Sequence, residues 1–178
     1  ADPMAREVVA VPTRGVERWL EQSLALRLGA SQGRADGVCA GIDFPFPARV
    51  VGGALARASG VAPDEDPWLA DRVVWPLMRV AAECMDERWM APLAAHLGGG
   101  DGHDAARQGR RYASLRHLAD LFDRYAVHRP GMLLAWAAGR DADGDGEDLP
   151  ADLAWQAGLW RRLRDRLGVP SPAERVQD

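Results

Sequence analysis

The sequence predicts an α/β protein that is predominantly helical, with a short parallel sheet at its start and a helical body after it. Two observations carry this prediction. Two short apolar runs, at 7–12 and 38–44, alternate with two segments of helical spacing. From about residue 61 onward, apolar residues recur almost only at helical intervals, and no internal repeat is present. We therefore expect a strand–helix–strand–helix opening over residues 1–60 and a mainly helical subdomain over 61–178 that continues the same unit.

The opening segment contains turn and capping residues where this order of elements requires them. Residues 7–12 read as a buried strand, and Thr13 can cap a helix whose apolar stripe runs from Val16 to Leu28. Residues 38–44 read as a second strand. Pro45 and Pro47 hold the residues before them extended, and a helix over 47–58 follows. Two strands this short do not form a stable sheet alone, so we expect them to pair with further strands.

The helical body divides at glycines and prolines. We expect helices over 67–84, 89–97, 107–128, 132–138 and 152–167. The longest has an apolar stripe of Leu115, Leu118, Phe122 and Tyr125. The tryptophans of this region read as core or interdomain packing residues.

Composition excludes several functions. The chain has 178 residues, 47% of them hydrophobic, which is enough for a packed core, and no run approaches the roughly 20 apolar residues of a membrane span. The net charge of −4 argues against sequence-independent coating of DNA, so any nucleic-acid contact must be local. Two separated cysteines indicate a reducing compartment. No signal peptide is evident, and both ends read like cuts within a larger protein.

All 22 basic residues are arginine, and the chain contains no lysine. A Walker A loop places a lysine on the phosphates, and many metal-dependent nucleases need a catalytic lysine. We therefore expect neither ATP hydrolysis nor nuclease chemistry from this chain, and no catalytic residue in it.

Three motifs resemble sites, but each has a simpler interpretation. Residues 29–33 match the G-x-S-x-G nucleophile elbow, yet they follow an expected helix instead of a strand, so we interpret them as a helix end. The glycine run 98–100, followed by Asp101, His103 and Asp104, lacks a lysine for phosphate and a fourth metal ligand. We interpret it as a connector and expect no metal site.

The third motif is the acidic segment 141–152, which matches a calcium loop at its first, third, fifth and sixth positions. Asp148 stands where an apolar residue is usual, and Asp152 stands where the bidentate glutamate is expected. We interpret the segment as a solvated acidic loop. A calcium-binding helical module remains an alternative.

The expected helix 107–128 combines arginines with a row of carboxylates. Asp120, Asp123, Arg124 and Val127 fall on one side of it, and Arg129 follows its end. Such a row is usual for a solvated face with intrahelical ion pairs. The functional alternative is a DNA contact, in which arginines hold phosphates or base edges and carboxylates accept from base amino groups.

Several local motifs occur in an order that resembles one known family. They are Val11-Pro12-Thr13-Arg14-Gly15, Ile42-Asp43-Phe44-Pro45-Phe46-Pro47, Ala119-Asp120-Leu121-Phe122-Asp123-Arg124-Tyr125, Arg129-Pro130 and Ala154-Trp155-Gln156-Ala157. The chain resembles the N-terminal region of the exodeoxyribonuclease V gamma subunit, the RecC family, over nearly its whole length.

The resemblance implies a fragment of a degenerate superfamily 1 helicase-like (P-loop NTPase-like) domain with a helical insertion. It implies a non-catalytic part of the RecBCD helicase–nuclease in double-strand break repair, which guides single-stranded DNA and recognises a recombination hotspot. The implied partners are single-stranded and forked DNA and the RecB and RecD subunits. ATP and Mg²⁺ would serve the partner subunits, and the location would be the bacterial cytoplasm, at the nucleoid. The alternative is a purely structural assembly module without direct DNA contact.

Carried over by position, the resemblance implies a set of DNA-binding residues: Arg14, Arg18, Phe46, Asp120, Leu121, Asp123, Arg124, Arg129 and Arg175. Pro12, Arg14, Arg18 and Gly52 depart from the familiar pattern, so the hotspot sequence does not transfer with them. Phe46, held extended between two prolines, can present its ring to a base or pack in the core. Arg129 can bind phosphate or guanine, or act as a cation at a helix end.

Overall fold

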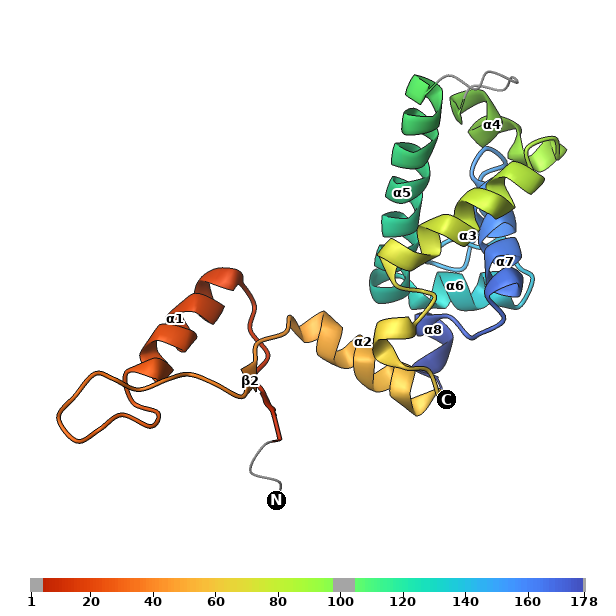
Figure 1. Cartoon of the computed structure of the whole chain (residues 1–178). Coiled ribbons are helices and arrows are strands. Elements are labelled where there is room, and N and C mark those ends of the chain that lie inside the picture. The colour runs from red at the N-terminus through yellow and green to blue at the C-terminus, as the bar shows by residue number, and fades with distance from the viewer. Residues whose placement is uncertain (1–4, 98–104, 178) are drawn as a thin grey trace. The chain divides into compact units, whose positions relative to one another are not determined.

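The computed structural model describes residues 5–97 and 105–177, and side chains within the latter range from 109 onward. The chain forms two compact units, residues 1–58 and 59–178 (Figure 1). Helices make up most of the described residues in the second unit and less than half of those in the first. No helix in the described ranges is long and apolar enough to cross a membrane.

The N-terminal unit contains two strands and two helices: β1 (Glu7–Val8), α1 (Arg14–Ala25), β2 (Ile42–Asp43) and α2 (Pro47–Ala58). The strands pair in parallel, with Glu7 opposite Ile42. Backbone bonds from Val9 N–H to the Asp43 carbonyl (2.9 Å) and from Val11 N–H to the Pro45 carbonyl (3.0 Å) continue the pairing. The two strands therefore pair with each other, and both are shorter than the sequence suggests.

Helix α1 starts where its capping residue predicts. Thr13 is extended, with φ −149° and ψ 156°, and its side chain accepts a hydrogen bond from Val16 N–H at 3.2 Å. None of the residues of α1 is buried, and Trp19 is 64% exposed. The apolar side of this helix is thus only partly covered within the N-terminal unit.

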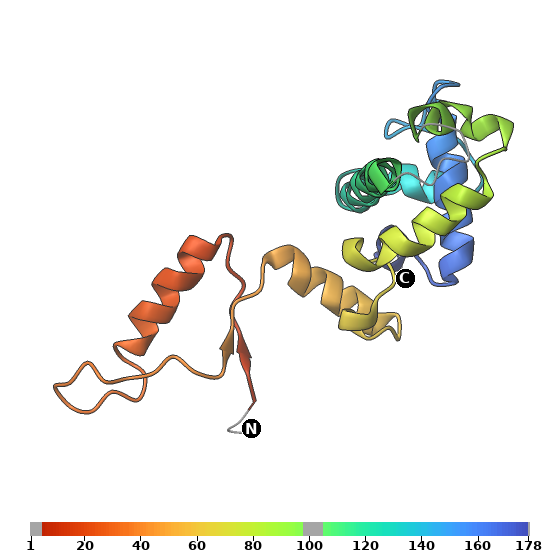
Figure 2. The same ribbon diagram turned by 45° about the horizontal axis from the view of Figure 1, so that its top comes forward.

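The C-terminal unit is a helical bundle, seen from a second direction in Figure 2. Its long helices are α3 (Ala70–Glu83), α5 (Ala105–His128) and α7 (Ala154–Leu167). The shorter elements are the 3₁₀ turns η1 (Pro63–Glu65) and η2 (Arg88–Met90), and the helices α4 (Ala91–Leu97), α6 (Pro130–Ala137) and α8 (Pro172–Arg175). Helix α3 packs against both α5 and α7. Pro130 starts α6, two residues earlier than the apolar pattern suggests.

Aromatic rings form the centre of this unit. Trp136 and Trp160 are fully buried, and their ring centroids lie 6.1 Å apart in an edge-to-face arrangement. Phe122 and Tyr125 of α5 also meet Trp136 edge to face. The Trp136 indole N–H donates to the Ala142 carbonyl at 2.7 Å, so the polar atom of this buried ring has a hydrogen-bond partner. This confirms the predicted core role of these tryptophans.

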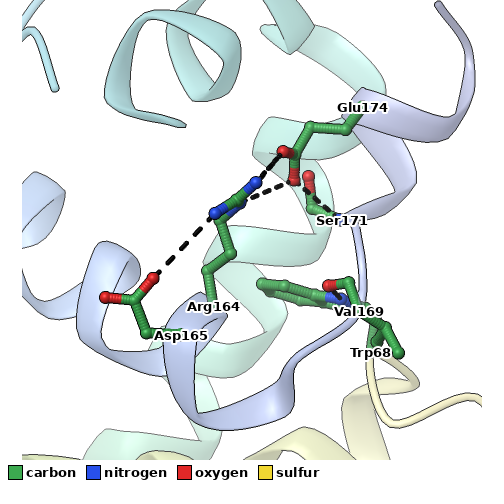
Figure 3. A network of polar contacts seen from close by, with 6 residues as sticks. All are labelled: Trp68, Arg164, Asp165, Val169, Ser171 and Glu174. Atoms are coloured by element: carbon green, nitrogen blue, oxygen red, sulfur yellow. Dashed lines mark hydrogen bonds and ion pairs between the residues drawn. The ribbon is translucent and has the colours of Figure 1, made fainter. Parts of the chain in front are cut away.

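Polar contacts fasten the end of the chain to this core (Figure 3). The Arg164 guanidinium donates to both carboxylate oxygens of Glu174, at 2.6 Å to the nearer, and Ser171 N–H donates to the same carboxylate at 2.8 Å. The Trp68 indole N–H donates to the Val169 carbonyl at 3.2 Å. Burial raises the pKa of Glu174, but the bonds from Arg164 and Ser171 outweigh it, so the pKa lies below its ordinary value.

The predominantly helical class with a short parallel sheet is thus confirmed. This fold class follows from the positions of capping residues and prolines and from the helical spacing of apolar residues in α3, α5 and α7.

Candidate nucleic-acid interface

The outer face of α5 brings four of the expected DNA-binding residues together. Asp120, Asp123 and Arg124 lie on the side of the helix away from the buried Leu118 and Phe122, and Leu121 lies at the edge of that side. Val127, one turn further on, is 64% exposed. The row is therefore a solvent-facing strip of mixed charge, as helical spacing predicts.

Arg116 links this strip to the neighbouring helix. Its guanidinium donates to the Ala70 carbonyl at the start of α3, at 2.7 Å, and pairs with Asp120 at 3.5 Å. Asp120 is thus partly neutralised within the helix. The sequence predicts the Asp120 pair from its four-residue spacing, whereas the link to Ala70 depends on tertiary packing.

Asp123 carries a less hydrated carboxylate. Partial burial of the group raises its pKa, and the neighbouring charge of Asp120 raises it further. No salt bridge within the described residues involves Asp123. A carboxylate of this kind gains more from accepting a hydrogen bond than a fully hydrated one does, which suits recognition of an amino group.

Arg129 lies between α5 and α6. Its backbone N–H continues the α5 pattern by donating to the Tyr125 carbonyl at 2.9 Å, and it occupies the N-cap of α6 with φ −139°. The side chain of Arg129 lies against the acidic loop at Gly144. A Cβ added to Gly144 would be 3.4 Å from the Arg129 Cδ. Arg129 is exposed, and the junction between α5 and α6 fixes the direction of its backbone.

The acidic loop beside Arg129 is closed by its own backbone. Asp143 N–H donates to the Glu147 carbonyl and Leu149 N–H to the Asp141 carbonyl, both at 2.7 Å. The Asp143 carboxylate accepts from the N–H groups of Asp145 and Glu147. Across the described residues, no group of three or more potential metal ligands lies together. The Asp143 carboxylate thus serves as a turn residue that holds the loop closed.

An open groove, with a volume of about 510 Å³, borders the strip on the Leu121 side. It lies among α4, α5 and α7, and its lining includes His96, His117, Leu121, Trp155 and Gln156. The Tyr125 hydroxyl donates to the Gln156 side-chain oxygen at 3.2 Å, which orients the amide. Sequence reasoning missed this groove because it joins three helices, although Trp155-Gln156 is part of a motif on which the resemblance depends.

Arg14, Arg18 and Phe46 belong to the N-terminal unit. Arg14 begins α1 after β1, and Phe46 follows β2, so both lie beyond the carboxyl ends of the parallel strands. Ligands of open α/β sheets commonly bind at this edge. Arg14 and Arg18 are exposed, and Phe46 is 44% exposed, so its ring is not enclosed in the core.

Arg175 occupies a different environment from the rest of the set. It is 4% exposed, and its guanidinium donates to both oxygens of the buried Asp66, at 2.5 and 3.0 Å. An arginine enclosed in this way stabilises the packing of α8 and does not offer its charge to a phosphate. We therefore do not include it in the interface. Its buried partner lies 109 positions away, where no local pattern indicates it.

The remaining motifs agree with their simpler interpretations where the structure describes them. Gly29 follows the end of α1 with φ +65°, and Ser31 N–H donates to the Asp36 carboxylate in the following turn. Residues 29–33 thus form a helix end and a loop. The glycine run and His103 lie outside the described residues.

Comparison with known proteins decides the family. The family described as "RecC, N-terminal domain" matches residues 1–177. This chain belongs to the RecC N-terminal domain family. Among RecC-family relatives named "RecBCD enzyme subunit RecC", the Mycobacterium tuberculosis protein is 48% identical over 96% of this chain and 15% of its own length. The Mycolicibacterium smegmatis protein is 45% identical over 96% of this chain and 14% of its own length.

The Escherichia coli relative is 29% identical over 95% of the chain and 14% of its own length. The chain thus spans about one seventh of the RecC proteins that it matches. The resemblance inferred from short motifs is confirmed over residues 1–177 of this chain.

Proposed function

We propose that this chain is the non-catalytic, DNA-guiding N-terminal part of an exodeoxyribonuclease V gamma subunit, acting in the RecBCD complex during repair of double-strand breaks by homologous recombination. Single-stranded DNA passes along the outer face of α5. RecB and RecD are its partner subunits, in the bacterial cytoplasm at the nucleoid. The observation that carries the proposal is the exposed strip of Asp120, Asp123 and Arg124 on α5, in a chain of the RecC family.

The side chains of the strip are better suited to recognising base edges of a DNA strand than to binding its phosphates by charge alone. Arg124 and Arg129 supply exposed guanidinium groups for phosphates or guanine edges. Asp120 and Asp123 repel phosphate but can accept hydrogen bonds from cytosine or adenine amino groups. The net charge of −4 agrees with a few local contacts. Recognition of a hotspot sequence is therefore part of this proposal, with Leu121 and Phe46 as apolar contacts.

The proposal assigns no catalytic step to this chain. The absence of lysine removes the phosphate-binding lysine of a Walker A loop, and ATP and Mg²⁺ serve the partner subunits. A parallel β1–α1–β2 unit at the start of the chain supports descent from a helicase motor domain that has lost its nucleotide site.

A second candidate is a module that only holds subunits together. The uncovered apolar residues of α1 favour it, since Trp19 is 64% exposed and Leu26 is 60% exposed. This candidate predicts that changes in α5 leave DNA binding unaltered and that changes in α1 disturb assembly.

The experiment that separates the two uses the assembled complex with Asp123→Ala and Arg129→Ala variants. Binding of forked DNA is measured over a range of salt concentrations, and subunit content is measured by size-exclusion chromatography. We expect complete assembly with weakened DNA binding, and Arg129→Ala should reduce the salt slope by about one. Val176→Ala, at a residue that is 65% exposed on α8, is the control. Wild-type DNA binding by both α5 variants would contradict the guiding role.

A further inference from the structure

An exposed aromatic pair lies on the surface shared by α3 and α5, outside the residues considered above. The ring centroids of Trp75 and Tyr112 are 5.8 Å apart, with planes tilted by 40°. Trp75 is 60% exposed and Tyr112 is 40% exposed, so their contact covers only part of the two rings. Large aromatic side chains left open in this way mark interaction sites more often than solitary exposed residues do.

The pair is held in place by buried neighbours. Val74, just before Trp75, and Leu77, two residues after it, are 1% and 0% exposed, so Trp75 points away from the buried side of α3. Arg116, one turn after Tyr112, fixes α5 to the start of α3 through the Ala70 carbonyl. The two rings are thus presented by rigid helices, which reduces the entropy cost of binding.

Arginines surround the aromatic pair. Arg72 and Arg79 lie one turn before and one turn after Trp75 on the same side of α3, and both are exposed. Neither takes part in a salt bridge within the described residues. The acidic residues of α3 near this side are Asp71 and Glu83, and Glu83 is paired with Arg166. Unpaired cations beside open rings complement a ligand that has both phosphates and flat apolar faces.

We infer that Trp75 and Tyr112 form a base-stacking platform for single-stranded DNA, with Arg72 and Arg79 holding the adjacent phosphates. Stacking on aromatic rings does not depend on base identity, so this platform would hold the strand without reading it. Arg116 connects the platform to the α5 strip, because it contacts Asp120 on one side and lies one turn from Tyr112 on the other. The strand would thus run along α5 from the stacking platform to the residues that read its sequence.

This inference rests on the proposed function, since it adds a second contact to the same DNA path. The test uses the assembled complex and single-stranded DNA carrying 5-iodouracil, which crosslinks under long-wave ultraviolet light to aromatic side chains in contact with it. Crosslinked peptides are mapped by mass spectrometry. We expect a crosslink at Trp75 or Tyr112 that is lost in Trp75→Ala and retained in Trp75→Phe. Val176→Ala, at an exposed residue to which no role is assigned, should leave it unchanged.

A companion measurement uses the 178-residue chain itself, with oligo(dT) and an abasic oligonucleotide of the same length. Trp75→Ala should weaken oligo(dT) binding by about 5- to 150-fold, the effect of losing one stacked base. It should leave abasic DNA binding unchanged, whereas Arg79→Ala should weaken both. Circular dichroism of each variant checks that the helices are intact.

The outcomes separate this inference from the proposed function. Crosslinks elsewhere in the chain but none at Trp75 or Tyr112 would refute the platform and leave the guiding role intact. No crosslink anywhere in the chain would contradict both. Loss of RecB or RecD from the Trp75→Ala complex, with DNA crosslinks unchanged, would show that a protein surface covers the pair and would overturn the platform.

Discussion

Replacing Arg175 by alanine should destabilise the C-terminal unit strongly while leaving the DNA-contacting face unaltered. Arg175 and Asp66 are 4% and 6% exposed. The guanidinium donates two hydrogen bonds to the carboxylate, of 2.5 and 3.0 Å. Removing the arginine leaves a buried carboxylate whose other contact is Trp68 N–H at 3.1 Å. Breaking a buried pair from one side costs about 3–5 kcal/mol of unfolding free energy.

The assay is urea denaturation of the 178-residue chain, followed by tryptophan fluorescence and circular dichroism. The buried Trp68 and Trp160 report on the same core. Asp66→Leu combined with Arg175→Met should lose less stability than Arg175→Ala alone, because no charge is then left unpaired. Val176→Ala, at an exposed neighbour, should stay within about 0.5 kcal/mol of the wild type. An Arg175→Ala protein of wild-type stability but reduced DNA affinity would refute this reasoning and return Arg175 to the interface.

Three further predictions concern charge and packing in the same unit. Asp123→Asn should raise the unfolding midpoint near pH 7, because the raised pKa of Asp123 means that folding disfavours its ionised form; the gain should vanish below the ordinary aspartate pKa. Glu174→Gln should remove a stabilisation that is present at neutral pH and lost on acidification, because the pKa of Glu174 is lowered beside Arg164. Thermal melts between about pH 7 and 3 test both variants. Leu77→Ala, at a side chain that is 0% exposed, should cost about 2–5 kcal/mol in urea denaturation.

The sequence predicted the elements well where a local signal marks their ends. Thr13 caps α1 as expected, and the stripe of Leu115, Leu118 and Phe122 correctly identifies the buried side of α5. The same spacing placed Asp120 and Asp123 on the opposite side. Local rules were sufficient in these places because helical geometry fixes which residues share a face.

Contacts between distant segments could not be read from the sequence. The resemblance placed Arg175 among the DNA-binding residues, because nothing near it in the sequence indicates that Asp66 lies within hydrogen-bonding distance. The sequence left Trp75 open between core and interdomain packing, and its 60% exposure shows that it is not part of the core of this unit, because the buried side of α3 includes Val74 and Leu77 instead. The parallel pairing of the two strands, which Val9 and Val11 extend beyond the short ladder, likewise joins segments that a helix and a loop separate in the sequence. In each case, tertiary packing decides between alternatives that local spacing leaves open.

The central claim is that DNA travels along the outer face of α5, and a density map of the assembled complex holding single-stranded DNA tests it most directly. The account predicts strand density against Asp120, Asp123 and Arg124, with no nucleotide bound by this chain. Density for the strand elsewhere, with that face of α5 covered by protein, would contradict it.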